Sequence, residues 1–106
     1  MIDEILNQIL SQILPCSPAP FEGKETEYLA WTYNEIPAVI AEGVPDVVRY
    51  LINITYVLPR NKNGMATRRR ICKDLLAAGF ASPSTQNIGD ETAQAWAIET
   101  EFEEAF

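Results

Sequence analysis

One stretch, Val47–Leu58, constrains the fold more than any other part of the chain. Its residues alternate in character, and successive residues of a β-strand face opposite sides of a sheet. One side of this strand is wholly apolar and consists of Val48, Tyr50, Ile52, Ile54, Tyr56 and Leu58. The other side is mixed and includes Arg49, Asn53 and Thr55. The pattern predicts the central strand of an antiparallel sheet whose apolar face is covered by helices.

Two amphipathic helices are predicted to provide that cover. Within residues 1–14, apolar side chains recur at helical spacing from Ile2 to Leu14, and Pro15 ends the pattern. The second helix is expected over residues 65–78. Its apolar stripe is predicted to contain Ile71, Cys72, Leu75 and Leu76, and Gly79 is placed as its C-terminal cap.

The remaining segments complete a small sheet. Prolines predict an exposed loop over residues 15–27. Strands are expected over 28–35 and 36–42, the latter at an edge because Pro37 lacks an amide hydrogen. An irregular edge strand over 80–87 and a closing strand over 95–103 follow. The order predicts a single α+β domain over residues 1–106, with an antiparallel or mixed four- to five-stranded sheet and two helices on one face.

Composition argues against several classes of function. The net charge of −7 disfavours binding to nucleic acid or to an anionic membrane. No apolar run approaches the roughly 18 residues of a membrane span, and Asp3 and Glu4 stand where a signal peptide carries basic residues. There is no histidine, and Cys16 and Cys72 fit no metal spacing. We expect no metal, no cofactor and a core position for Cys72.

An enzyme is also disfavoured. The acids Glu99, Glu101 and Glu103 lie on one face of the closing strand, as paired catalytic carboxylates do. At a spacing of two on an outer face, they are more simply a solvated surface that discourages edge-to-edge aggregation. The sequence shows no nucleophile motif and no glycine-rich phosphate loop.

The charges are strongly segregated along the chain. Residues 60–73 hold six of the eight basic residues and no acid, whereas residues 90–106 are acidic and contain no base. Three interpretations stay open: a solvated face or pairing between the two segments inside one protomer, a head-to-tail contact between protomers, and a nucleic-acid patch on residues 68–70. The candidates for contact between subunits are Arg60, Lys62, Arg68, Arg69, Arg70, Glu99, Glu101 and Glu103.

The layout is similar to that of a known group of proteins. An amphipathic helix and a proline-bearing loop precede an aromatic strand (Trp31, Tyr33) and the long strand Arg49–Val57. The next helix ends in LLAAGF, and an acidic strand, Trp96–Phe102, closes the chain. This order resembles the small tail-completion and tail-terminator proteins of long-tailed bacteriophages.

The resemblance implies a non-enzymatic virion structural protein. Such a subunit forms a homo-hexameric ring at the head-proximal end of the tail, is assembled in the host cytoplasm, and contacts tail-tube and head-connector proteins. The loops Pro15–Glu27 and Pro59–Gly64 are then expected to touch the neighbouring ring or tube. The alternative is a small acidic protein-binding or regulatory module, which the acidic C-terminal segment supports. That module would form a one-to-one complex with a basic host protein.

Overall fold

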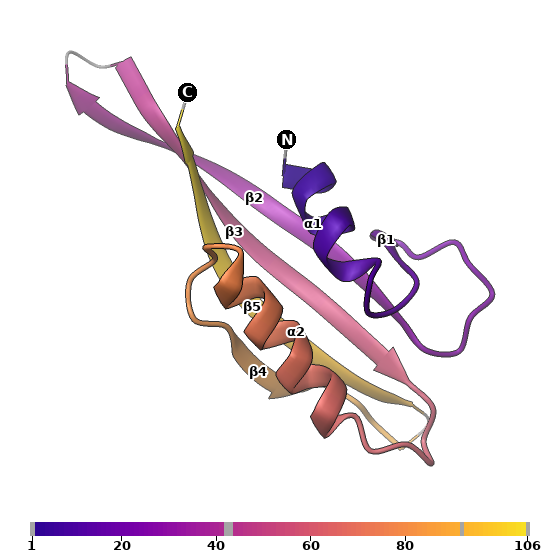
Figure 1. The fold of residues 1–106 in the computed structure, drawn as a ribbon. Helices are drawn as coiled ribbons and strands as arrows, with labels where there is room; N and C mark the ends of the chain where they lie inside the picture. Colours follow the sequence, from indigo (N-terminus) through magenta and orange to yellow (C-terminus); the bar gives the residue numbers. More distant parts are fainter. Residues whose placement is uncertain (1, 42–43, 92, 106) are drawn as a thin grey trace.

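The chain folds into a five-stranded mixed sheet with two helices (Figure 1). The computed structural model describes residues 2–41, 44–91 and 93–105, with backbone only for 37–46 and 105. The strand order is β1-β2-β3-β5-β4, and among these described strand pairs only β1–β2 is parallel. The elements are α1 (Ile2–Leu10), β1 (Cys16–Pro18), β2 (Tyr28–Ala41), β3 (Val44–Leu58), α2 (Met65–Ala77), β4 (Ser84–Asn87) and β5 (Gln94–Ala105). The predicted α+β class is confirmed.

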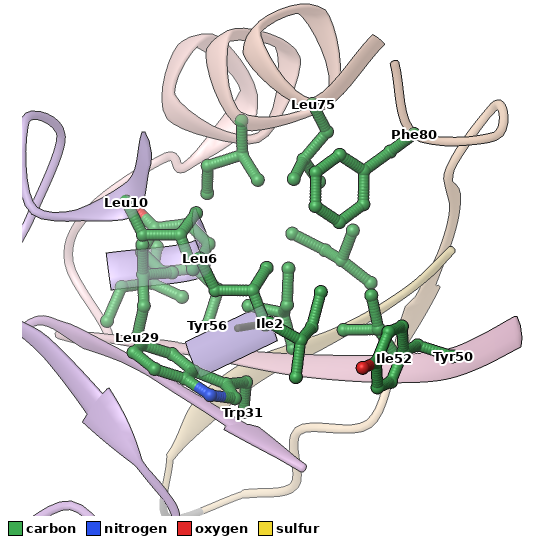
Figure 2. Packing of buried hydrophobic residues seen from close by; sticks show 14 of the residues in the cluster. Ile2, Leu6, Leu10, Leu29, Trp31, Tyr50, Ile52, Tyr56, Leu75 and Phe80 are labelled. Atoms are coloured by element: carbon green, nitrogen blue, oxygen red, sulfur yellow. The ribbon is translucent and has the colours of Figure 1, made fainter. Parts of the chain in front are cut away.

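Strand β3 lies at the centre of the sheet, as its alternating sequence predicts. It pairs with β2 on one side and with β5 on the other. Every residue of its predicted apolar side is at most 8% exposed. These side chains meet Ile2, Leu6 and Leu10 of α1 and Ile71 and Leu75 of α2 in one hydrophobic core (Figure 2). Both helices therefore cover the same face of the sheet, and no helix of the described ranges lies on the other face (Figure 1).

The N-terminal helix is shorter than its periodicity predicts. Helix α1 ends at Leu10, and residues 11–14 form a turn in which the amides of Ile13 and Leu14 both donate to the Leu10 carbonyl. Ile13 and Leu14 still pack against the core. These two residues are therefore apolar because they pack against the core, not because they belong to a helix. The helix ends before them, and the turn directs the chain from Leu14 to Pro15 and on to the sheet.

The segment predicted as a loop over residues 15–27 contains a short strand. Strand β1 runs parallel to residues 29–31 of β2, and backbone hydrogen bonds at its two ends join Leu29 to Pro15 and Ala19 to Trp31. A strand of three residues is too short to produce a visible alternation in sequence. The prediction of a continuous loop was wrong for this reason.

The two strands predicted over 28–35 and 36–42 form one continuous strand, β2. Pro37 fits because β1 pairs only with residues 29–31, so β2 is an edge strand at position 37 within the described part of the chain. Residues 35–41 of β2 and 44–47 of β3 form the end of a long hairpin, which we call the arm. The arm extends beyond both helices (Figure 1), and the molecule measures 54 × 25 × 25 Å.

The end of α2 follows the prediction more closely than its apolar stripe does. Gly79 has a φ of 96°, and the Phe80 amide donates to the Leu75 carbonyl while the Gly79 amide donates to Leu76. These two bonds form a Schellman cap. Phe80 then enters the core and is 3% exposed. Leu76, which was placed in the buried stripe, is instead 50% exposed.

The two C-terminal strands differ in length from their predictions. Strand β4 spans only Ser84–Asn87, after Pro83, and all of its residues are exposed at the sheet edge. Strand β5 is longer than the predicted 95–103, because it pairs with β3 over its whole length. Ile98 and Thr100 are buried towards the helices, as expected, and Trp96 and Phe102 are partly buried beside them.

Candidate interaction surfaces

The three consecutive arginines of α2 have three different environments. The Arg68 guanidinium lies over the Trp96 ring of β5, and its Nε is buried without an acceptor among the described residues. Arg70 is 3.7 Å from the Asp74 carboxylate and donates to the Gln12 carbonyl. Arg69 is exposed and has no ion pair within the described part of the chain. Arg69 is therefore the arginine of this run whose charge is free to meet another molecule.

The two basic residues before α2 are used inside the protein. Lys62 Nζ lies 2.8 Å from Glu27 Oε1, and the Tyr56 hydroxyl donates to the other Glu27 oxygen at 2.5 Å. Burial raises the pKa of Glu27, but the hydrogen bonds from Lys62 and Tyr56 outweigh it and lower that pKa below its ordinary value. Arg60 donates to the backbone carbonyl of Glu91. The Arg60–Glu91 bond is thus one place where the basic and acidic segments meet within a protomer.

The predicted acidic contacts of β5 lie on the side of the sheet away from the helices. Ile98 and Thr100 point into the core, so Glu99, Glu101 and Glu103 project from the opposite face. Glu103 is held by Arg49 of β3 at 3.2 Å. No ion pair joins residues 68–70 to these three acids in the described ranges. The sheet therefore lies between the exposed Arg69 on α2 and the side chains of these three glutamates.

The open face of the sheet contains a polar hollow of about 620 Å³. Asn53 of β3 lies opposite Glu99 of β5 within it, and Leu51 lies opposite Glu101. Asn34, Ser82 and Ser84 complete the polar lining. This arrangement offers carboxylate and amide oxygens, which suit the cationic side chains of a partner protein.

A second hollow lies between α2 and β4, and we call it the α2–β4 groove. It has a volume of about 480 Å³ and is lined by Met65, Arg68, Arg69, Cys72, Lys73, Leu76 and Thr85. Two large apolar side chains of this lining are exposed to solvent: Met65 is 44% exposed and Leu76 is 50% exposed. Burial raises the pKa of the Cys72 thiol, and Arg68 opposes that rise. The sequence did not reveal this groove, because apolar residues on an outer helix face look like part of a core stripe.

The described residues contain neither a candidate metal centre nor a helix that could span a membrane. No group of three or more His, Cys, Asp or Glu side chains there is arranged to hold a metal ion. Among the helices that the structure describes, none has the length and apolar character needed to cross a bilayer. Comparison with protein-family models and with curated proteins finds no match to this chain.

Proposed function

We propose that this protein is a non-enzymatic structural subunit of a bacteriophage virion. In this proposal it is a tail-completion or tail-terminator protein, and six copies form a ring at the head–tail joint. The resemblance in element order and the α+β architecture support this assignment. The protein would act in the particle, at the head-proximal end of the tail, after assembly in the host cytoplasm.

One observation carries the proposal: opposite charges occupy opposite faces of the sheet. Arg69 and Lys73 are exposed on α2, above one face, and Glu99 and Glu101 are exposed on the other. A subunit with complementary surfaces on two sides binds the next copy head to tail, and such contacts close into rings when the rotation between copies allows it. Tail-tube and head-connector proteins would then contact the two ends of the ring.

A pair of charge reversals tests this contact. Arg69→Glu and Glu101→Arg should each weaken self-association, because each places like charges across the interface. The double variant should restore it, since the two signs are then exchanged. Glu4→Arg is the matched control, because Glu4 is exposed on α1, outside both charged segments and both loops expected to contact other subunits. The measurement is the light-scattering mass of the purified protein at several concentrations.

The measured mass distinguishes the ring-forming subunit from the alternative regulatory module. A hexameric mass that both single variants reduce supports the ring. Unimpaired assembly of both variants would remove these charges from the interface. A stable one-to-one complex with a basic host protein, without higher symmetry, would favour the alternative of a small acidic regulatory module. Deleting the gene from the parent phage and imaging separate heads and tails, or tails of uncontrolled length, would test the role in the particle.

A further inference from the structure

Two exposed cations of α2 form a short row along one side of the helix. Arg69 and Lys73 are four residues apart, so their Cβ atoms are about 5–6 Å from one another on the same side. Both side chains line the α2–β4 groove, and both are exposed. Neither has an ion pair within the described part of the chain. The helix therefore presents two positive charges at a fixed spacing to another molecule.

A row of acids with nearly the same spacing lies on the opposite side of the sheet. Glu99 and Glu101 are alternate residues of β5, so they point to the same side and are about 6.8 Å apart along the strand. Both are exposed in the polar hollow, and neither has an ion pair among the described residues. The next acid on this face, Glu103, is instead held by Arg49 at 3.2 Å. The hollow thus offers two negative charges that match the row on α2.

We propose that α2 of one copy lies along β5 of the next copy, with Lys73 against Glu99 in the polar hollow. This inference rests on the proposed ring, and it adds a second charge pair and a direction to the contact between Arg69 and Glu101. With that first pair in place, Glu99 is the acid left for Lys73, because Glu103 is already paired within its own copy. Helix α2 therefore runs antiparallel to β5 of its neighbour, and the contact is heterologous.

The residues beside the two acids suit the two cations. Asn53 lies opposite Glu99 on the neighbouring strand, and its amide oxygen can accept a hydrogen bond from the lysine ammonium. Leu51 lies opposite Glu101 and offers apolar surface to the methylene stem of Arg69. Directly opposite residues have Cβ atoms about 4.5–5.5 Å apart, so one side chain can reach both. Each cation therefore meets a carboxylate and a second neighbour that fits the rest of its side chain.

Carbodiimide cross-linking of the full chain tests the contact, because this reagent couples a lysine amine directly to a carboxylate beside it. Within each protomer Lys62 and Glu27, which are 2.8 Å apart, should couple and serve as the positive control. Between protomers we expect covalent oligomers on a denaturing gel, and peptide mapping should find Lys73 joined to Glu99. A mixture of isotope-labelled and unlabelled protein shows which links join different copies. Lys73→Arg is the matched variant: it keeps the positive charge but has no amine to couple, so it should retain the assembled mass and lose this link.

The light-scattering mass of the same sample separates the outcomes. A hexameric sample with Lys73 linked to Glu99 of another copy supports the contact and its direction. A hexameric sample in which Lys73 is linked only to Glu101 or Glu103 of another copy, or is not linked between copies while Lys62 and Glu27 are coupled, overturns the contact and leaves the ring intact. A dimeric mass with the Lys73–Glu99 link keeps the contact and overturns the ring. A monomeric sample that shows only the internal link overturns both for the protein alone.

Discussion

The guanidinium carbon of Arg68 lies 3.5 Å from the centroid of the Trp96 ring. This contact joins α2 to β5 on the helix-covered side of the sheet, where Trp96 packs against the core. It also changes the interpretation of the arginine run. Arg68 serves the fold, Arg70 contacts Asp74 and the carbonyl of Gln12, and Arg69 remains available.

Replacing Arg68 should therefore destabilise the protein more than replacing its neighbour. Arg68→Ala removes a cation–π contact at a partly buried site, which is worth about 1 kcal/mol. It also exposes part of the Trp96 ring. Arg69→Ala should change the free energy of unfolding by less than about 0.5 kcal/mol, because its side chain is exposed. Urea unfolding of both variants measures the difference, and equal losses would show that the ring contact contributes nothing.

Asp3 connects α1 to β2 and should be important for stability. Its two carboxylate oxygens accept hydrogen bonds from Trp31 Nε1 at 2.8 Å and from the Tyr33 hydroxyl at 3.1 Å. Asp3→Ala leaves the donor of the buried Trp31 without its partner, so we expect a loss of about 2 kcal/mol. Glu4→Ala is the control, because Glu4 is exposed in the same helical turn. Thermal or urea unfolding should separate the two; a loss no larger than that of Glu4→Ala would contradict the prediction.

Tyr56 should make the protein sensitive to alkali. Burial, and then the hydrogen bond to Glu27, raise the pKa of Tyr56 from 10.0 to about 12. The folded state thus retains a proton that the unfolded state releases, so its contribution to stability is complete below about pH 10 and is lost as the pH rises towards 12. The loss is at most about 3 kcal/mol.

Urea midpoints measured from pH 9 to 11.5 would show this dependence on Tyr56. The wild-type midpoint should fall across that interval, and Tyr56→Phe should fall less steeply because it has no hydroxyl to ionise there. Some slope should remain in the variant, because a hydrogen bond to Asp3 raises the pKa of Tyr33 and burial raises that of Tyr50. Parallel slopes in the two proteins would contradict the assignment.

Gly79 should be intolerant of alanine for conformational reasons alone. Its φ of 96° is rarely adopted by residues with a side chain, although a Cβ there would meet no atom within 4 Å. Gly79→Ala should therefore cost about 1 kcal/mol. Gly79→Asn should cost less, because asparagine tolerates positive φ better than alanine does. Circular dichroism melting of both variants tests the order, and a neutral alanine variant would show that the helix end relaxes.

The central part of the fold could be predicted because its sequence signals are periodic. The alternation of residues 47–58 correctly identifies a central strand and its buried side. Gly79 correctly marks the end of α2. Periodicity says less about the ends of elements, because Ile13 and Leu14 are apolar for packing rather than for helix formation. It also could not reveal β1, a very short strand whose partner follows only after an intervening loop.

The interaction surfaces were only partly visible in sequence. The charge segregation was evident, but the sequence could not tell that Arg69 and Lys73 lie on the opposite side of the sheet from Glu99 and Glu101. The same limitation applies to Leu76, which follows the helical apolar spacing but is exposed at the α2–β4 groove. The assignment to a phage tail remains a prediction, which the charge reversals and cross-links are designed to test.

The central position of β3 also determines the order in which its two neighbouring strands can pair with it. Its partner β2 immediately precedes it in the chain, so this hairpin closes a short loop and can form early. Its other partner, β5, follows only after α2 and β4. During synthesis β3 therefore emerges with one edge unpaired and an apolar face that still lacks α2. A nascent chain paused between Leu58 and Gln94 would expose that strand to other chains, so this interval is when the protein is most open to misassociation.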